Sequence, residues 1–158
     1  MRRVNTVILF GLLFSATQAS AIQKYINKYS ERYHVNPRLV EAMIYVESSF
    51  RINVVGDDGC SHGLMQIQMS TARDEGFRGT RQQLIWPIYN IKYGVKYLRT
   101  LLAWTQGDVL QALDAYNRGI GNVLRRPYRG DWREHKYVGK IIKFLEANGN
   151  SRVLQIGK

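Results

Sequence analysis

Apolar residues recur every three or four positions along most of the chain, which is the spacing of one face of an amphipathic helix. The clearest row lies in residues 36–50 and consists of Leu39, Met43, Val46 and Phe50. Asn36 can cap a helix with its side-chain oxygen, and Pro37 suits the first helical position because its missing N–H is not needed there. The sequence therefore predicts a helix over this segment.

The same spacing, together with cap residues, predicts helices in five further segments, namely residues 22–34, 70–73, 87–104, 108–119 and 131–149. Pro87 opens one of them, and Asp108 and Asp131 are each followed three residues later by Gln111 or Glu134, as in a capping box. Alternating apolar and polar runs, which are typical of strands, are almost absent. The expected fold is therefore all-α, in a single domain.

Glu47 stands in a second row of the 36–50 helix that is otherwise apolar, after Val40 and Ile44. A carboxylate at such a position costs free energy unless it is paired or protonated, and desolvation raises its pKa. A carboxyl group that is protonated at neutral pH is what a general acid requires. The spacing leaves a second interpretation open, in which Glu47 tilts into solvent at the helix end and has no function.

The first 21 residues have the three parts of a secretory signal peptide, with Arg2 and Arg3, an apolar run over residues 7–16 and small residues before the cleavage point at Ala21. Removal of these 21 of 158 residues would leave 137, which suits one domain at 22–148 and a tail at 149–158. The apolar run is shorter than the roughly 18 residues of a membrane span. We expect an exported protein, periplasmic or associated with the cell wall, without a stable membrane span after cleavage. An uncleaved N-terminal anchor is the alternative.

Lysine and arginine outnumber the acidic residues by 23 to 12, which gives a formal charge of +11. Without Arg2 and Arg3 the charge is about +9. Such a charge favours a polyanionic partner, such as DNA, anionic lipid headgroups or the acidic polymers of bacterial cell walls. Export removes most contact with nucleic acid, so nucleic acid is not expected as a partner.

Cys60 is the only cysteine, so no intramolecular disulfide is possible. Cys60 and His62 could suggest a pair of metal ligands, but the other histidines are distant in sequence and no carboxylate–histidine motif accompanies them. We therefore expect neither a metal nor another cofactor.

Three short motifs, in their order and separation, resemble the ES, GLMQ and AYN motifs of the lytic transglycosylases. They are Glu47-Ser48-Ser49-Phe50, Gly63-Leu64-Met65-Gln66 and Ala115-Tyr116-Asn117. Further positions that fit the same family are Asn90-Ile91, Gly94, Tyr97-Leu98 and Tyr137-Val138. The resemblance covers roughly residues 22–147, most of the chain that would remain after processing.

The resemblance to the soluble lytic transglycosylase (SLT) domain implies a lysozyme-like helical fold with a groove for peptidoglycan glycan strands. It implies Glu47 as the sole catalytic acid and base, cleaving the MurNAc-GlcNAc β-1,4 bond with formation of 1,6-anhydro-MurNAc. Small single-domain members of the family serve secretion, conjugation or pilus assemblies or travel in phage particles, so such a partner is implied as well. The implied substrate-binding residues are Ser48, Gly63, Met65, Gln66, Tyr116, Asn117 and Tyr137.

Two alternative functions remain at this point. A lysozyme-type hydrolase needs a second carboxylate, for which Asp57 and Asp58 are the candidates close in sequence to Glu47. A non-catalytic peptidoglycan-binding assembly protein would keep the groove without turnover. The chain also departs from the family pattern at Arg118, which follows the AYN motif where a small residue is common.

Overall fold

The structure, a computed structural model, describes residues 6–56 and 59–155, with side chains for residues 16–56 and 59–154. Its helices are α1 (Thr6–Tyr33), α2 (Pro37–Ser48), α3 (Met69–Asp74), α4 (Arg81–Ile85), α5 (Pro87–Trp104), α6 (Val109–Arg118), α7 (Ile120–Arg125), α8 (Val138–Ala147) and the 3-10 helix η1 (Ser151–Gln155). A short antiparallel hairpin pairs β1 (Ser61–His62) with β2 (Ile67–Gln68). In the described part of the chain, no helix combines the length and apolar character that a membrane crossing requires.

The start signals predicted for three helices are present. The Asn36 side chain accepts a hydrogen bond from the N–H of Arg38 at 2.9 Å, and α2 starts with a proline. α5 begins at Pro87 and ends at Trp104, as predicted. Asp108 caps α6 by accepting from the N–H of Gln111 at 3.0 Å.

Two helix starts differ from the sequence prediction. The helix expected over residues 22–34 is the second half of α1, which already begins at Thr6. The helix expected from Asp131 begins only at Val138. Asp131 instead accepts a hydrogen bond from the N–H of Arg133 at 2.9 Å, within the turn before α8.

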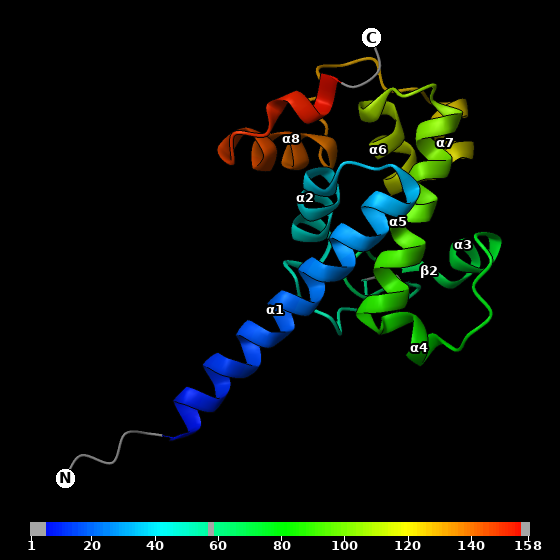
Figure 1. The fold of residues 1–158 in the computed structure, drawn as a ribbon. Coiled ribbons are helices and arrows are strands. Elements are labelled where there is room, and N and C mark those ends of the chain that lie inside the picture. Colours follow the sequence, from blue (N-terminus) through cyan, green and yellow to red (C-terminus); the bar gives the residue numbers. More distant parts are fainter. Residues whose placement is uncertain (1–5, 57–58, 156–158) are drawn as a thin grey trace.

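α5 is the central helix, because α1 lies along one side of it and α6 packs on another (Figure 1). α2 packs against both α1 and α8, while α3, α4 and the hairpin gather around the first half of α5 (Figure 1). Side chains that are fully buried between these helices include Ile26, Met43, Ile44, Ile91, Leu98, Leu113 and Ile141. Most of the apolar rows identified in the sequence thus meet in a common core.

The GLMQ segment is fixed to α5 by the buried amide of Asn90. Its nitrogen donates to the carbonyls of His62 at 2.8 Å and Leu84 at 3.0 Å, and its oxygen accepts from the N–H of Met65 at 2.8 Å. Gly63 lies so close that an added Cβ would be 2.4 Å from the amide nitrogen, and its φ is +75°. Glycine is therefore required there for both space and backbone conformation.

Candidate active site

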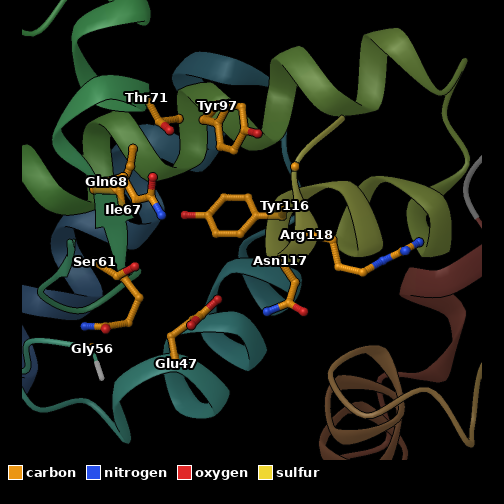
Figure 2. A pocket seen from close by; sticks show the side chains of 12 residues that line it. Glu47, Gly56, Ser61, Ile67, Gln68, Thr71, Tyr97, Tyr116, Asn117 and Arg118 are labelled. Atoms are coloured by element: carbon orange, nitrogen blue, oxygen red, sulfur yellow. The ribbon is translucent and has the colours of Figure 1, made fainter. Parts of the chain in front are cut away.

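The side chain of Glu47 lines a cleft of about 570 Å³ between the hairpin and α6. Figure 2 shows its carboxyl group pointing toward Tyr116, with Ser61 and Gln68 on one side of the cleft and Asn117 and Arg118 on the other. The described residues that line the cleft are Glu47, Gly56, Ser61, Gln66, Ile67, Gln68, Thr71, Tyr97, Tyr116, Asn117, Arg118 and Gly119. Glu47 is the only carboxylate among them.

Glu47 reaches this position because it lies in the last turn of α2, whose buried face is held in the core. The helix ends at Ser49, which adopts the left-handed conformation with a φ of 50° while its N–H donates to the carbonyl of Tyr45 at 2.9 Å. Ser48 is buried, and its hydroxyl lies 2.9 Å from the carbonyl oxygen of Leu64. The end of α2 is thereby joined to the GLMQ segment.

The carboxyl group of Glu47 is half-buried and has one hydrogen-bond partner among the described residues. Burial raises its pKa from the ordinary value of 4.5 to about 7, although the hydroxyl of Tyr137, which donates to Oε1 at 2.6 Å, acts in the opposite direction. Desolvation disfavours the anion more than this one hydrogen bond stabilises it. Near neutral pH, Glu47 can therefore either donate or accept a proton.

Two tyrosines surround this group without competing for its proton. The Tyr116 hydroxyl donates to the carbonyl of Met65 at 2.9 Å, and its ring lies 5.2 Å from that of Tyr97. Burial first, and then the negative charge of Glu47, raise the pKa values of Tyr116 and Tyr137 well above 10.0. Both phenols stay protonated, so Tyr137 remains a hydrogen-bond donor to Glu47.

Gln66 lies in the cleft wall with a φ of 45°. Its side-chain nitrogen donates to the carbonyls of Gly63 at 2.8 Å and Val54 at 3.1 Å. The nitrogen is thus occupied within the protein, and the amide is held in a fixed orientation.

The predicted site residues fall into two groups. Glu47, Gln66, Tyr116 and Asn117 all line the cleft, although they come from three separate segments. The structure does not place Ser48, Gly63, Met65 or Tyr137 among the lining residues. Ser48 donates to Leu64 and Gly63 packs against Asn90, two residues that do not line the cleft. Met65 accepts a hydrogen bond from Tyr116, and Tyr137 donates one to Glu47.

Several residues that line the cleft are not among the predicted site residues. Tyr97 and Thr71 belong to α5 and α3, where helical spacing alone does not tell a cleft-facing side chain from a packed one. Ser61 and Gln68 face each other across the hairpin, which is too short for an alternating pattern to reveal. Asp57 and Asp58, the candidates for a second carboxylate, lie outside the described residues.

A buried carboxylate that the sequence analysis did not identify lies beside the cleft. Asp114 is fully buried on α6 and forms a double hydrogen bond with the guanidinium of Arg118, whose Nε lies 2.5 Å from Oδ1. The Nε2 atom of His135 lies 3.1 Å from the same Oδ1. Asp114 is thus paired on both sides, as a buried charge must be.

His135 connects Asp114 to the start of α8. Its Nδ1 accepts hydrogen bonds from the backbone N–H groups of Tyr137 at 3.3 Å and Val138 at 3.2 Å. Since Nδ1 is the acceptor, the proton of the neutral ring lies on Nε2, where it is donated to Asp114. The backbone that carries Tyr137 to Glu47 is therefore anchored to α6.

Residues 24–138 match the family model described as Transglycosylase SLT domain. The chain belongs to this family. The membrane-bound lytic murein transglycosylase C of Serratia proteamaculans is 36% identical over 115 residues, which are 63% of this chain and 32% of that relative. The transglycosylase of Enterobacteria phage PRD1 is 32% identical over 129 residues, 80% of this chain and 44% of the phage protein.

Among solved structures, an inactive mutant of lytic transglycosylase Slt from Pseudomonas aeruginosa is similar with a TM-score of 0.68 at 21% identity. The similarity covers 83% of this SLT chain and 25% of that one. It confirms the predicted all-α, lysozyme-like fold, in which the short hairpin is the one sheet among the described residues. The match to this chain spans about a third of the length of the Serratia proteamaculans relative and a quarter of the Pseudomonas aeruginosa chain.

Proposed function

We propose that this protein is a peptidoglycan lytic transglycosylase, which cleaves the MurNAc-GlcNAc β-1,4 bond and releases 1,6-anhydro-MurNAc. The observation that carries the proposal is Glu47, the one carboxylate among the described lining residues, with a pKa raised to about 7. Membership of the SLT family and relatives named lytic murein transglycosylases support the choice of substrate.

In the first step, protonated Glu47 acts as the general acid. Tyr137 occupies Oε1, so the proton to be transferred is carried by Oε2. As the bond between C1 of MurNAc and the glycosidic oxygen breaks, its electron pair stays on the oxygen, which takes the proton and leaves as the 4-hydroxyl of GlcNAc. The remaining MurNAc ring has oxocarbenium character.

In the second step, ionised Glu47 acts as the base. It removes the proton from the 6-hydroxyl of the same MurNAc, and O6 forms a bond to C1. This closes the anhydro ring and returns Glu47 to its protonated state, so no water is consumed. The hydrogen bond from Tyr137 stabilises the anion between the two steps, and a pKa close to neutral lets one group serve in both.

The product of cell-wall digestion tests this mechanism. We expect mass spectrometry to find anhydro ends, one water lighter than the reducing ends of a hydrolase, and Glu47→Gln to abolish their formation. Asp57→Asn and Asp58→Asn should keep the anhydro product and most of the rate. Predominantly reducing ends, or inactivity of either folded aspartate variant, would assign the protein to the lysozyme-type hydrolases.

We also propose that the glycan is contacted by Glu47, Gln66, Tyr116 and Asn117. Tyr137 does not contact the glycan and positions the Glu47 carboxyl group through its hydrogen bond. Ser48, Gly63 and Met65 contribute by shaping the cleft. This division is supported by which side chains line the cleft and which are buried beneath it. Saturation-transfer NMR with a short glycan and Glu47→Gln tests it, since Asn117→Ala should weaken binding without lowering the thermal midpoint.

Export, and removal of residues 1–21, complete the proposal. Burial supports the boundary, because residues 16–21 on α1 are exposed or half-buried, whereas Ile22 is the first buried core position among the residues whose side chains are described. N-terminal sequencing of protein recovered from a periplasmic fraction should begin at Ile22. A partner in a secretion, conjugation, pilus or phage assembly is proposed on the resemblance, and the phage relative is in accord with it.

A further inference from the structure

A second cleft, of about 650 Å³, lies beside the one that contains Glu47. The described residues that line it are Asn117, Arg118, Asn122, Arg125 and Arg126, so arginine and asparagine line it without a carboxylate. Asn117 and Arg118 line both clefts, so the two spaces are adjacent. Figure 2 shows the Arg118 side chain extending away from Glu47, beyond Asn117. This second space is the basic cleft.

The positive charge of the basic cleft comes from Arg125 and Arg126 rather than from Arg118. The guanidinium of Arg118 is neutralised by Asp114 and also donates to the carbonyl of Arg126 at 3.1 Å, which fixes the chain beyond α7. Arg125 donates only to neutral groups, the carbonyl of Gly121 at 3.2 Å and the side-chain oxygen of Asn122 at 2.9 Å. Among the described residues, no ion pair involves Arg125 or Arg126, and both are exposed. Two positive charges are therefore available to a ligand.

We propose that the basic cleft binds carboxylate groups of the peptide stem attached to the MurNAc residue at the cleavage site. The proposal rests on the proposed function, because it assumes that a glycan strand occupies the Glu47 cleft. The sugars of such a strand are largely neutral, whereas its stem peptides carry free carboxylates. Guanidinium groups recognise carboxylates through paired hydrogen bonds, and Arg125 is already held in place by its neutral partners. A stem leaving a sugar beside Asn117 lies next to the basic cleft, because Asn117 lines both spaces.

Binding measured with a Glu47→Gln background separates this site from turnover. The probes are soluble glycan strands that carry stem peptides and the same strands after an amidase has removed the peptides and the lactyl carboxylates exposed by this cleavage have been converted to neutral amides. We expect Arg125→Gln/Arg126→Gln to weaken binding of the peptide-bearing strands by about fivefold, the size expected of exposed charge pairs. Binding of the stripped strands should change much less.

The matched control is Arg81→Gln/Arg99→Gln, which removes two exposed arginines from α4 and α5 and alters the net charge equally. It should leave the preference for peptide-bearing strands intact, and the thermal midpoints of both double variants should match that of the background. Equal losses on the two probes, or an equal effect of the control, would overturn the proposal. If the wild-type chain makes no anhydro product while the peptide-dependent loss persists, the proposed function is wrong and the basic cleft remains a carboxylate site.

Discussion

The Glu47 side chain exerts opposing effects on catalysis and on stability. Its pKa is 4.5 in an ordinary environment and about 7 in the folded protein, so between these values the folded state binds more protons than the unfolded state. The free energy of unfolding must then fall as pH rises from about 4.5 to about 7, and it stays lowered above pH 7. The carboxyl group thus lowers stability under the conditions in which it can work.

Replacing Glu47 with glutamine should remove this penalty. We expect Glu47→Gln to be inactive and, at pH 8, to be more stable than the wild type by about 3 kcal/mol, the value that the rise in pKa from 4.5 to about 7 implies. Below pH 4.5 the two proteins should have equal stability. Chemical denaturation across this pH range measures the difference, and a variant markedly less stable than wild type at pH 8 would indicate a structural role for the carboxylate.

The Tyr137 hydroxyl limits how far burial raises the pKa of Glu47. Its hydrogen bond lowers that pKa, so Tyr137→Phe should raise it further. Because the acid must be protonated in the free enzyme, kcat/KM should fall as pH rises through about 7 in the wild type and at a higher pH in the variant. Tyr45→Phe, at an exposed position on α2, is the control and should leave the profile in place. An unshifted profile for Tyr137→Phe would remove Tyr137 from this role.

At the scale of single residues, the sequence analysis identified Glu47 but not Asp114, although each is a carboxylate within an apolar row of a helix. Asp114 follows Leu110 by one helical turn and precedes Arg118 by another, so a carboxylate stands in an apolar row with a cation within reach. What the sequence could not provide was His135, which lies in an irregular segment and reaches Asp114 only through the tertiary fold.

At the scale of elements, caps decided which predictions succeeded. α2, α5 and α6 were predicted because proline, asparagine or aspartate precedes a periodic apolar row. The predicted start of α8, at Asp131, was too early. The N–H groups of Tyr137 and Val138 instead donate to the ring of His135, a residue that is not a usual helix cap. α4 and α7, with 5 and 6 residues, are too short to show a period. α4 still carries the capping box of Thr80 and Gln83, a readable signal that was overlooked.

The contact of α6 with the segment before α8 depends on Asp114. Asp114→Asn would leave Arg118 and His135 without their shared anion, and breaking a buried pair in this way costs about 3 kcal/mol. We expect a corresponding loss in the free energy of unfolding, measured in urea. Asp74→Asn, at an exposed position on α3, should change it by less than about 0.5 kcal/mol. Equal stability of the two variants would show that the pairing adds nothing.

At the scale of the whole molecule, charge should act on approach to the wall more than on cleavage. The formal charge of +11 favours attraction to an anionic wall, and this attraction is screened over about 10 Å at 0.1 M salt. Binding to intact walls should therefore weaken as salt rises, while cleavage of a short neutral glycan should change little. Equal salt sensitivity in sedimentation and cleavage assays would show that the charge does not serve attraction to the wall.

The amide of Asn90 also bears on how the protein ages. Hydrolysis of this amide to a carboxylate would set an anionic oxygen against the carbonyl of His62 or Leu84, and the GLMQ segment would lose its attachment to α5. Full burial within a helix shields the group from that reaction. Asn148 is exposed at the end of α8 and is followed by Gly149, which has no side chain to hinder attack on the amide, so it is the amide expected to be lost first on storage. Chemical damage would then begin at a site that is not among the residues lining the Glu47 cleft, and a stored sample could change its charge before it loses activity.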